Sequence, residues 1–132
     1  MCNKLRTLLS TMKEMFYDCI NITSISFPKL ERISGDDALQ GFALGCSSLS
    51  SITFPALERI EASDVFSNIF SGGNKSLSFP ALTTISDNDA FCDIAAITTL
   101  TIHFKSGMES TVQGLTGYPN FGGSNTTILF DL

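Results

Sequence analysis

The segment "SITFPALERI", from 51 to 60, decides the fold because the chain repeats it with small changes. A near-copy, "SISFPKLERI", covers residues 24 to 33, and a looser copy, "SLSFPALTTI", covers residues 76 to 85. A degenerate fourth copy is "AITTLTIHF", from 96 to 104. Self-similarity at a nearly fixed period is the sequence signature of a repeat protein.

Two columns of apolar residues show how regular the spacing is. One column contains Phe27, Phe54, Phe79 and Ile102, and the interval between its members shortens slightly along the chain. The other column has the same intervals and contains Ile25, Ile52, Leu77 and Leu100. A proline follows the phenylalanine in the first three copies, and His103 takes its place in the fourth. The agreement of both columns predicts about four structural repeats.

Within one copy the pattern is that of a strand followed by a turn. Side chains alternate in a strand, so Ile52 and Phe54 point one way while Ser51 and Thr53 point the other. Pro55 lacks a backbone N–H and ends the strand. We expect Leu57 and Ile60, which are three residues apart, to close a bend rather than to continue a strand.

A second phrase, a phenylalanine followed by small residues or cysteine, follows each copy. It reads "FYDC" at 16–19, "FALGC" at 42–46, "FSGG" at 70–73 and "FCDI" at 91–94. One such unit cannot bury its apolar face alone, whereas stacked units place phenylalanine over phenylalanine in a shared core. The sequence therefore predicts a single solenoid domain.

The two ends of the chain differ from the repeats, as the caps of a solenoid do. Residues 1–15 form either an amphipathic helix or the remnant of an earlier repeat. The repeats occupy residues 16–104, and the Gly-rich tail 105–132, which ends in "TTILFDL", reads as a C-terminal cap with a final strand.

The repeats resemble the BspA-like class of leucine-rich repeats, also called the Treponema pallidum type. The matching segments are "ITSISFPKLERI" (22–33), "LSSITFPALERI" (49–60) and "SLSFPALTTI" (76–85), with "FALGCSSL" (42–49) and "DNDAF" (87–91) for the second phrase. The resemblance implies a right-handed leucine-rich-repeat solenoid, α/β or mainly β, with a parallel sheet on one face. It also implies a secreted or cell-surface protein of host-associated bacteria or protists, with a role in adhesion or protein binding.

Composition and charge exclude several classes of partner. The chain has 132 residues, a net charge of −5 and no cluster of Lys or Arg, so it lacks the basic surface that binds nucleic acid. No apolar run is long enough to span a membrane. The segment 1–19 does not form a signal peptide, because Lys13 and Glu14 interrupt its apolar stretch. The protein is therefore either intracellular or, as we expect, secreted by a leader that lies outside this sequence.

The best candidate for a binding surface is the outward face of the predicted strands. Its hydroxyl side chains fall into two expected columns, which are Ser26, Thr53, Ser78 and Thr101, and Ser24, Ser51, Ser76 and Thr99. These hydroxyls either form a flat polar face that binds a protein or glycan partner, or they are simply the polar side chains of a solvent-exposed sheet face.

The cysteines and acidic turns each have two interpretations. Cys19 and Cys46 occupy the same place in consecutive repeats, so we expect them close together, as small apolar side chains rather than as a disulfide. Cys2 and Cys92 show no zinc-binding spacing. The recurring acidic residues are Asp36, Asp37, Asp64, Asp87 and Asp89. Their spacing matches no calcium loop, so turn and cap formation is the preferred explanation.

No residue pattern indicates an enzyme, a metal or a cofactor. His103 is the single histidine, and the sequence places it on the surface without a catalytic partner. "GYPNFGG" (117–123) lacks the features of a phosphate-binding loop and reads as an ordinary loop. The sequons at Asn21, Asn74 and Asn125 matter only in a secreted eukaryotic protein.

Two functions follow as expectations. The first is a non-enzymatic interaction or adhesion module that binds a protein or glycan through a rigid sheet face. The alternative is a structural spacer in a larger surface protein whose binding or activity lies elsewhere.

Overall fold

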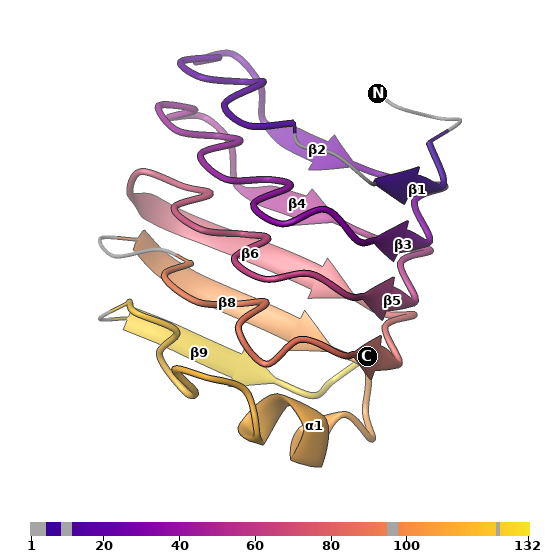
Figure 1. The fold of residues 1–132 in the computed structure, drawn as a ribbon. Coiled ribbons are helices and arrows are strands. Elements are labelled where there is room, and N and C mark those ends of the chain that lie inside the picture. Colours follow the sequence, from indigo (N-terminus) through magenta and orange to yellow (C-terminus); the bar gives the residue numbers. More distant parts are fainter. Residues whose placement is uncertain (1–4, 9–11, 95–97, 124) are drawn as a thin grey trace.

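Short segments in which Ser or Thr alternates with apolar residues form the strands of the larger of two parallel sheets. The computed structural model describes residues 5–8, 12–94, 98–123 and 125–132. In it the chain is a β-solenoid of about five coils (Figure 1). One side is a five-stranded, all-parallel sheet in the order β2-β4-β6-β8-β9. Its strands are β2 (Ser24–Ser26), β4 (Ser51–Thr53), β6 (Gly73–Phe79), β8 (Thr98–Phe104) and β9 (Asn125–Leu129).

A second parallel sheet, which the sequence did not predict, forms another side. Its four strands are β1 (Thr7–Leu8), β3 (Arg32–Ile33), β5 (Arg59–Ile60) and β7 (Thr84–Ile85), paired in that order. Ile60, which we expected in a bend, points into the core from β5. Such short strands show no alternation in the sequence, so only the pairing of one coil with the next reveals this sheet.

The remaining side of the coils consists of turns that are also bonded from coil to coil. The N–H groups of Asp37, Leu39 and Gly41 donate to carbonyl oxygens of the next coil at 2.9–3.0 Å. Backbone hydrogen bonds therefore tie neighbouring coils together on all three sides.

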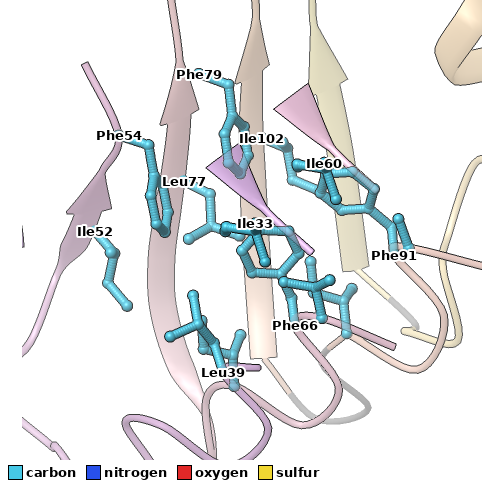
Figure 2. Close-up of a cluster of buried hydrophobic side chains, with 14 of the residues drawn as sticks. Ile33, Leu39, Ile52, Phe54, Ile60, Phe66, Leu77, Phe79, Phe91 and Ile102 are labelled. Carbon is cyan, nitrogen blue, oxygen red and sulfur yellow. The ribbon is translucent and has the colours of Figure 1, made fainter. Parts of the chain in front are cut away.

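Two interleaved columns of phenylalanine rings fill the space between the sides. The sheet column contains Phe27, Phe54, Phe79, Phe104 and Phe130, with ring centroids 5.1–5.9 Å apart and stacked planes. The turn column contains Phe16, Phe42, Phe66, Phe91 and Phe121. Figure 2 shows Phe54 and Phe79 from the sheet meeting Phe66 and Phe91 from the turns, and the two columns touch edge to face. Such contacts add to the gain from burial, which amounts to roughly 1.5–3 kcal/mol per side chain.

The predicted register of the fourth copy was wrong by two positions. Phe79 pairs with Phe104, and Leu77 pairs with Ile102, so the interval from Phe79 to Phe104 equals the interval from Phe54 to Phe79. Lys105, not His103, therefore follows the phenylalanine where the earlier copies have proline. A shift of two positions keeps every side chain on its own face of the sheet, which is why alternation alone did not expose the error.

The ends of the solenoid are unequal. The described residues between 5 and 15 form β1 and turns rather than a helix, and the N–H groups of Met12 and Glu14 donate to carbonyl oxygens of Ala38 and Gln40 in the second coil. The predicted final strand is present as β9, and Ile128 pairs with Ile102. The tail therefore continues the sheet as a fifth coil, and Phe130 extends the sheet column of rings. The short helix α1 (Glu109–Gln113) lies at this end of the stack, with Val112 buried (Figure 1).

Replacing Phe54 by alanine tests the role of the ring columns. Phe54 has no exposed surface and stacks between Phe27 and Phe79. We expect Phe54→Ala to lower the free energy of unfolding by roughly 3–5 kcal/mol, measured by urea denaturation. The control is Tyr17→Ala, because Tyr17 is 57% exposed and its loss should change stability by about 0.5 kcal/mol or less. Equal effects of the two substitutions would contradict this account of the core.

Candidate binding surface

All eight hydroxyl residues singled out in the sequence lie on the five-stranded sheet, and their side chains alternate with buried ones. Ser24, Ser26 and Thr99 are exposed, and the other five are half-buried. We call the outward side of these strands the hydroxyl face.

The strand pairing arranges the hydroxyl face in columns that differ partly from the predicted ones. The first column contains Ser24, Ser51, Ser76, Thr101 and Thr127. The second contains Ser26, Thr53, Ser78, His103 and Leu129. Thr99 lies in a third, shorter column between Asn74 and Asn125. Because the fourth copy has a different register from the predicted one, Thr101 lies in the first column instead of the second, and Thr99 lies in the third instead of the first. Both side chains still point outward.

The hydroxyl face is uncharged, and its hydroxyl groups are available for hydrogen bonding. None of the eight hydroxyls is hydrogen-bonded to another protein group within the described residues, and no Lys, Arg, Asp or Glu occupies the three columns. A hydroxyl both donates and accepts, so each can meet a polar group of either kind. Neighbouring hydroxyls are about 4.8 Å apart across strands and roughly 6.6 Å apart along a strand.

The ring column beneath the hydroxyl face is regular under its first three strands. The planes of Phe27 and Phe54 differ by 2°, and those of Phe54 and Phe79 by 8°. These rings directly follow Ser26, Thr53 and Ser78, which share one column of the hydroxyl face. The strands β2, β4 and β6 run side by side in nearly the same direction (Figure 1). The six hydroxyls above them form a flat grid held by a rigid core.

His103 takes the place of a hydroxyl residue in the second column, on β8. Its Nδ1 lies 3.0 Å from Asp131 Oδ1, an ion pair when the ring is protonated. Ser78 is its register partner on β6, yet no hydrogen bond joins Ser78 to His103. The three residue types are those of a nucleophilic triad, but the hydroxyl–imidazole bond that activates the nucleophile is not made. The contact with Asp131 instead holds the tail against β8.

The cysteines lie on the turn side. Cys46 is buried, its thiol lies 2.8 Å from the Phe16 carbonyl oxygen, and burial raises its pKa. Cys19 is close enough to perturb the same thiol, as the repeat alignment predicted. Cys19, Cys46 and Cys92 are free thiols, and Cys2 lies outside the described residues.

The acidic residues of the turns stabilise the backbone conformation of those turns. Asp37 and Asp64 have φ values of 56° and 51°, in the left-handed region that Asp and Asn tolerate better than most residues. Asp36 Oδ1 accepts a hydrogen bond from the Ser63 N–H at 2.9 Å, and Asp87 Oδ1 accepts one from Asp89. Among the described residues, no group of three His, Cys, Asp or Glu side chains is placed to hold a metal ion.

Two further sequence features are the loop at 117–123 and the three glycosylation sequons. The loop "GYPNFGG" is more than a connection, because its Phe121 is fully buried in the turn column. The sequon residues Asn21, Asn74 and Asn125 are all exposed. Asn74 and Asn125 lie on the hydroxyl face itself.

One buried charged residue, Lys75, was not predicted from the sequence. It lies on β6 between two face residues, Asn74 and Ser76, and alternation turns it inward, where it is 8% exposed. Its register partner Leu100 is apolar. The signal was present in the sequence: Lys75 immediately precedes Ser76, at a position that strand alternation assigns to the core.

Comparison with known proteins leaves the chain without a match: no family model, no curated protein and no solved structure is similar to it. No helix in the described part of the chain has the length and apolar character to span a bilayer.

A charge-removing substitution at Asp64 tests the electrostatics of the turns. Burial raises the pKa of the Asp64 carboxyl, and repulsion from Asp37, Asp89, Asp93 and Asp87 raises it further. The folded state therefore favours the protonated Asp64 carboxyl. The stability that this preference contributes is fully present below about pH 4 and is lost as pH rises through the raised pKa. We expect Asp64→Asn to raise the thermal midpoint at pH 7.

The gain from Asp64→Asn should disappear near pH 3, where both states of the wild type carry the protonated acid. Asn also tolerates the left-handed backbone. The matched control is Glu58→Gln, an exposed acid outside this group, which should leave the midpoint nearly unchanged. A lower midpoint for Asp64→Asn at pH 7 would show that the carboxylate stabilises the fold instead.

Proposed function

We propose that the chain is a non-enzymatic binding module that contacts a protein or glycan partner through the hydroxyl face. The observation that carries this proposal is the set of in-register hydroxyls that make no bond within the described part of the protein. Neutral hydroxyls suit the hydroxyl and amide groups of glycans and peptide backbones better than they suit a charged ligand.

Rigidity supports the proposal. The hydroxyls stand on the strands of a five-stranded sheet, above a stacked column of buried rings. A surface that is already ordered loses little conformational entropy when a partner binds, which favours affinity. The repeat pattern supports membership of the BspA-like leucine-rich-repeat class. Membership of this class would in turn imply a secreted or cell-surface location.

A structural spacer in a larger surface protein is the second candidate, and one feature favours it. Met15, Tyr17 and Ile20 in the first coil are 51%, 57% and 57% exposed. They lie at the end of the stack where β1 and β2 are the outermost strands of their sheets. Packing against another part of such a protein would cover these side chains.

A substitution on the hydroxyl face tests the binding proposal. Thr53 lies at the centre of the flat grid, where an arginine would hold a partner away from the sheet. We expect Thr53→Arg to weaken binding at least tenfold to the ligands that wild type selects from a glycan array or a panel of purified extracellular proteins. Thr84→Arg, the same change on β7 of the other sheet, is the matched control and should bind like wild type.

Thermal melting of both variants must match wild type for the comparison to hold. Equal binding by Thr53→Arg and wild type would exclude the hydroxyl face as the contact surface. No wild-type binding on either panel would favour the spacer.

A further inference from the structure

The first coil lies at the end of the stack and has a neighbouring coil on one side only. Its strands β1 and β2 are the outermost members of the two sheets, so each pairs along a single edge within the described chain. An unpaired edge offers backbone groups to another strand, and natural proteins usually protect such edges with charges or proline. The strand β2 reads Ser–Ile–Ser and has neither protection.

Apolar side chains are also uncovered at this end of the stack. Met15, Tyr17 and Ile20 are each more than half exposed. Phe16, the first ring of the turn column, is half-buried, whereas the other four rings of that column are fully buried. Among the described rings only Phe42 contacts Phe16, so the column ends with one side of a ring uncovered. A group of exposed apolar side chains at one place indicates a protein interaction site.

The second coil shows what kind of partner fits this surface. Its turns carry the same phrase as those of the first coil, and the side that faces the first coil is covered by a coil. There Phe42 contacts the ring of Phe16 edge to face at 5.1 Å, and the carbonyl oxygens of Ala38 and Gln40 accept hydrogen bonds from the first coil. By repetition, the uncovered side of the first coil is a surface that fits another coil of the same kind.

The charge of the first coil favours a second copy of this chain as the source of that coil. The basic residues in its described part, 5–8 and 12–26, are Arg6 and Lys13, and the acidic residues are Glu14 and Asp18. These charges cancel, although the whole chain has a net charge of −5. Two first coils can therefore approach each other without the repulsion that acts between the more acidic parts of two chains.

The opposite end of the solenoid does not offer a matching surface. The four-stranded sheet ends at β7 without a strand from the fifth coil, and the helix α1 lies at that end of the stack (Figure 1). In a head-to-tail arrangement β1 would therefore have no strand of the second sheet beside it. Two first coils instead present the same patch to each other about a two-fold axis, which is the commonest symmetry of protein dimers.

We propose that the protein forms a reversible symmetric dimer in which the first coils of two copies pack end to end. Met15, Tyr17 and Ile20 of each copy are covered by the same side chains of the other. The two β2 edges pair antiparallel, because a two-fold axis reverses the direction of a strand. The two five-stranded sheets then form one sheet, which doubles the area of the hydroxyl face. The dimer does not depend on what that face binds, so either proposal can fail without the other.

Sedimentation equilibrium on the wild-type chain tests the dimer. We expect the measured mass to rise with protein concentration and to level off at the mass of two chains. A mass that stays at one chain over the whole concentration range would overturn the proposal, and the exposed side chains would then support the spacer alternative. A mass that continues to rise beyond two chains would overturn it as well, because a head-to-tail contact does not close.

Amide hydrogen exchange locates the interface without any substitution. Between a dilute and a concentrated solution of the wild-type chain, the amides of residues 12–26 should gain protection, because the partner covers the turns and the open edge of β2. The amides of residues 125–132, at the opposite end of the stack, should exchange equally fast in both solutions. Protection that appears only in 125–132 would place the contact at the wrong end and would overturn the proposal.

A charge placed in the interface completes the test. Ile20→Glu should weaken dimerisation at least tenfold, because the contact would bury the new carboxylate without a partner. The matched control is Leu132→Glu, the same kind of change at a 43% exposed leucine of the fifth coil, which should dimerise like wild type. Both positions are exposed in the monomer, so both variants should keep the thermal midpoint of dilute wild type. Dimerisation of Ile20→Glu as strong as that of the Leu132→Glu control would overturn the proposed interface.

The dimer also sets the condition for the stability measurement on the core. Urea denaturation of Phe54→Ala and Tyr17→Ala is to be carried out in dilute solution, where the monomer predominates. Under that condition Tyr17 is exposed, and its substitution remains the neutral control.

Discussion

The stacking of phenylalanine on phenylalanine is the contact on which the rest of the solenoid depends. Parallel strands lie about 4.8 Å apart, and ring centroids in the sheet column lie 5.1–5.9 Å apart, so backbone pairing and ring stacking share almost one spacing. A single coil cannot bury its own apolar face, and it gains a core only from the coils beside it. The hydroxyls stand in register on the outside because the rings are in register on the inside.

The part of the fold that the sequence revealed is the part that repeats. The phenylalanine and leucine or isoleucine columns predicted a solenoid, its longer sheet and the inward or outward orientation of the hydroxyl residues. The register of the fourth copy was misplaced because alternation has a period of two, so Ile102 and Phe104 fit the phenylalanine column equally well by orientation. The interval from Phe54 to Phe79 distinguishes them, since it recurs only at Phe104, and the pairing of Phe79 with Phe104 confirms this choice.

What the sequence did not reveal comes from contacts between coils. The strands of the second sheet are too short for a local pattern, and the sheet exists because Ile33 lies beside Ile60. Phe121 and Phe130 sit in a tail that breaks the repeat, and their roles appear only when they meet Phe91 and Phe104. Lys75 carries no sign of burial apart from its place between the outward residues Asn74 and Ser76, which by strand alternation assigns it to the core.

The direction of the hydrogen bonds has a mechanical consequence. Bonds between parallel strands cross from strand to strand, so on all three sides of the solenoid they run along the axis of the stack. The cysteines in the described residues form no covalent bridge between coils. Tension along the axis would therefore separate one coil at a time, with few bonds loaded together, whereas tension along the strands would load many bonds in shear. The protein therefore resists tension along its strands better than tension along the axis of the stack.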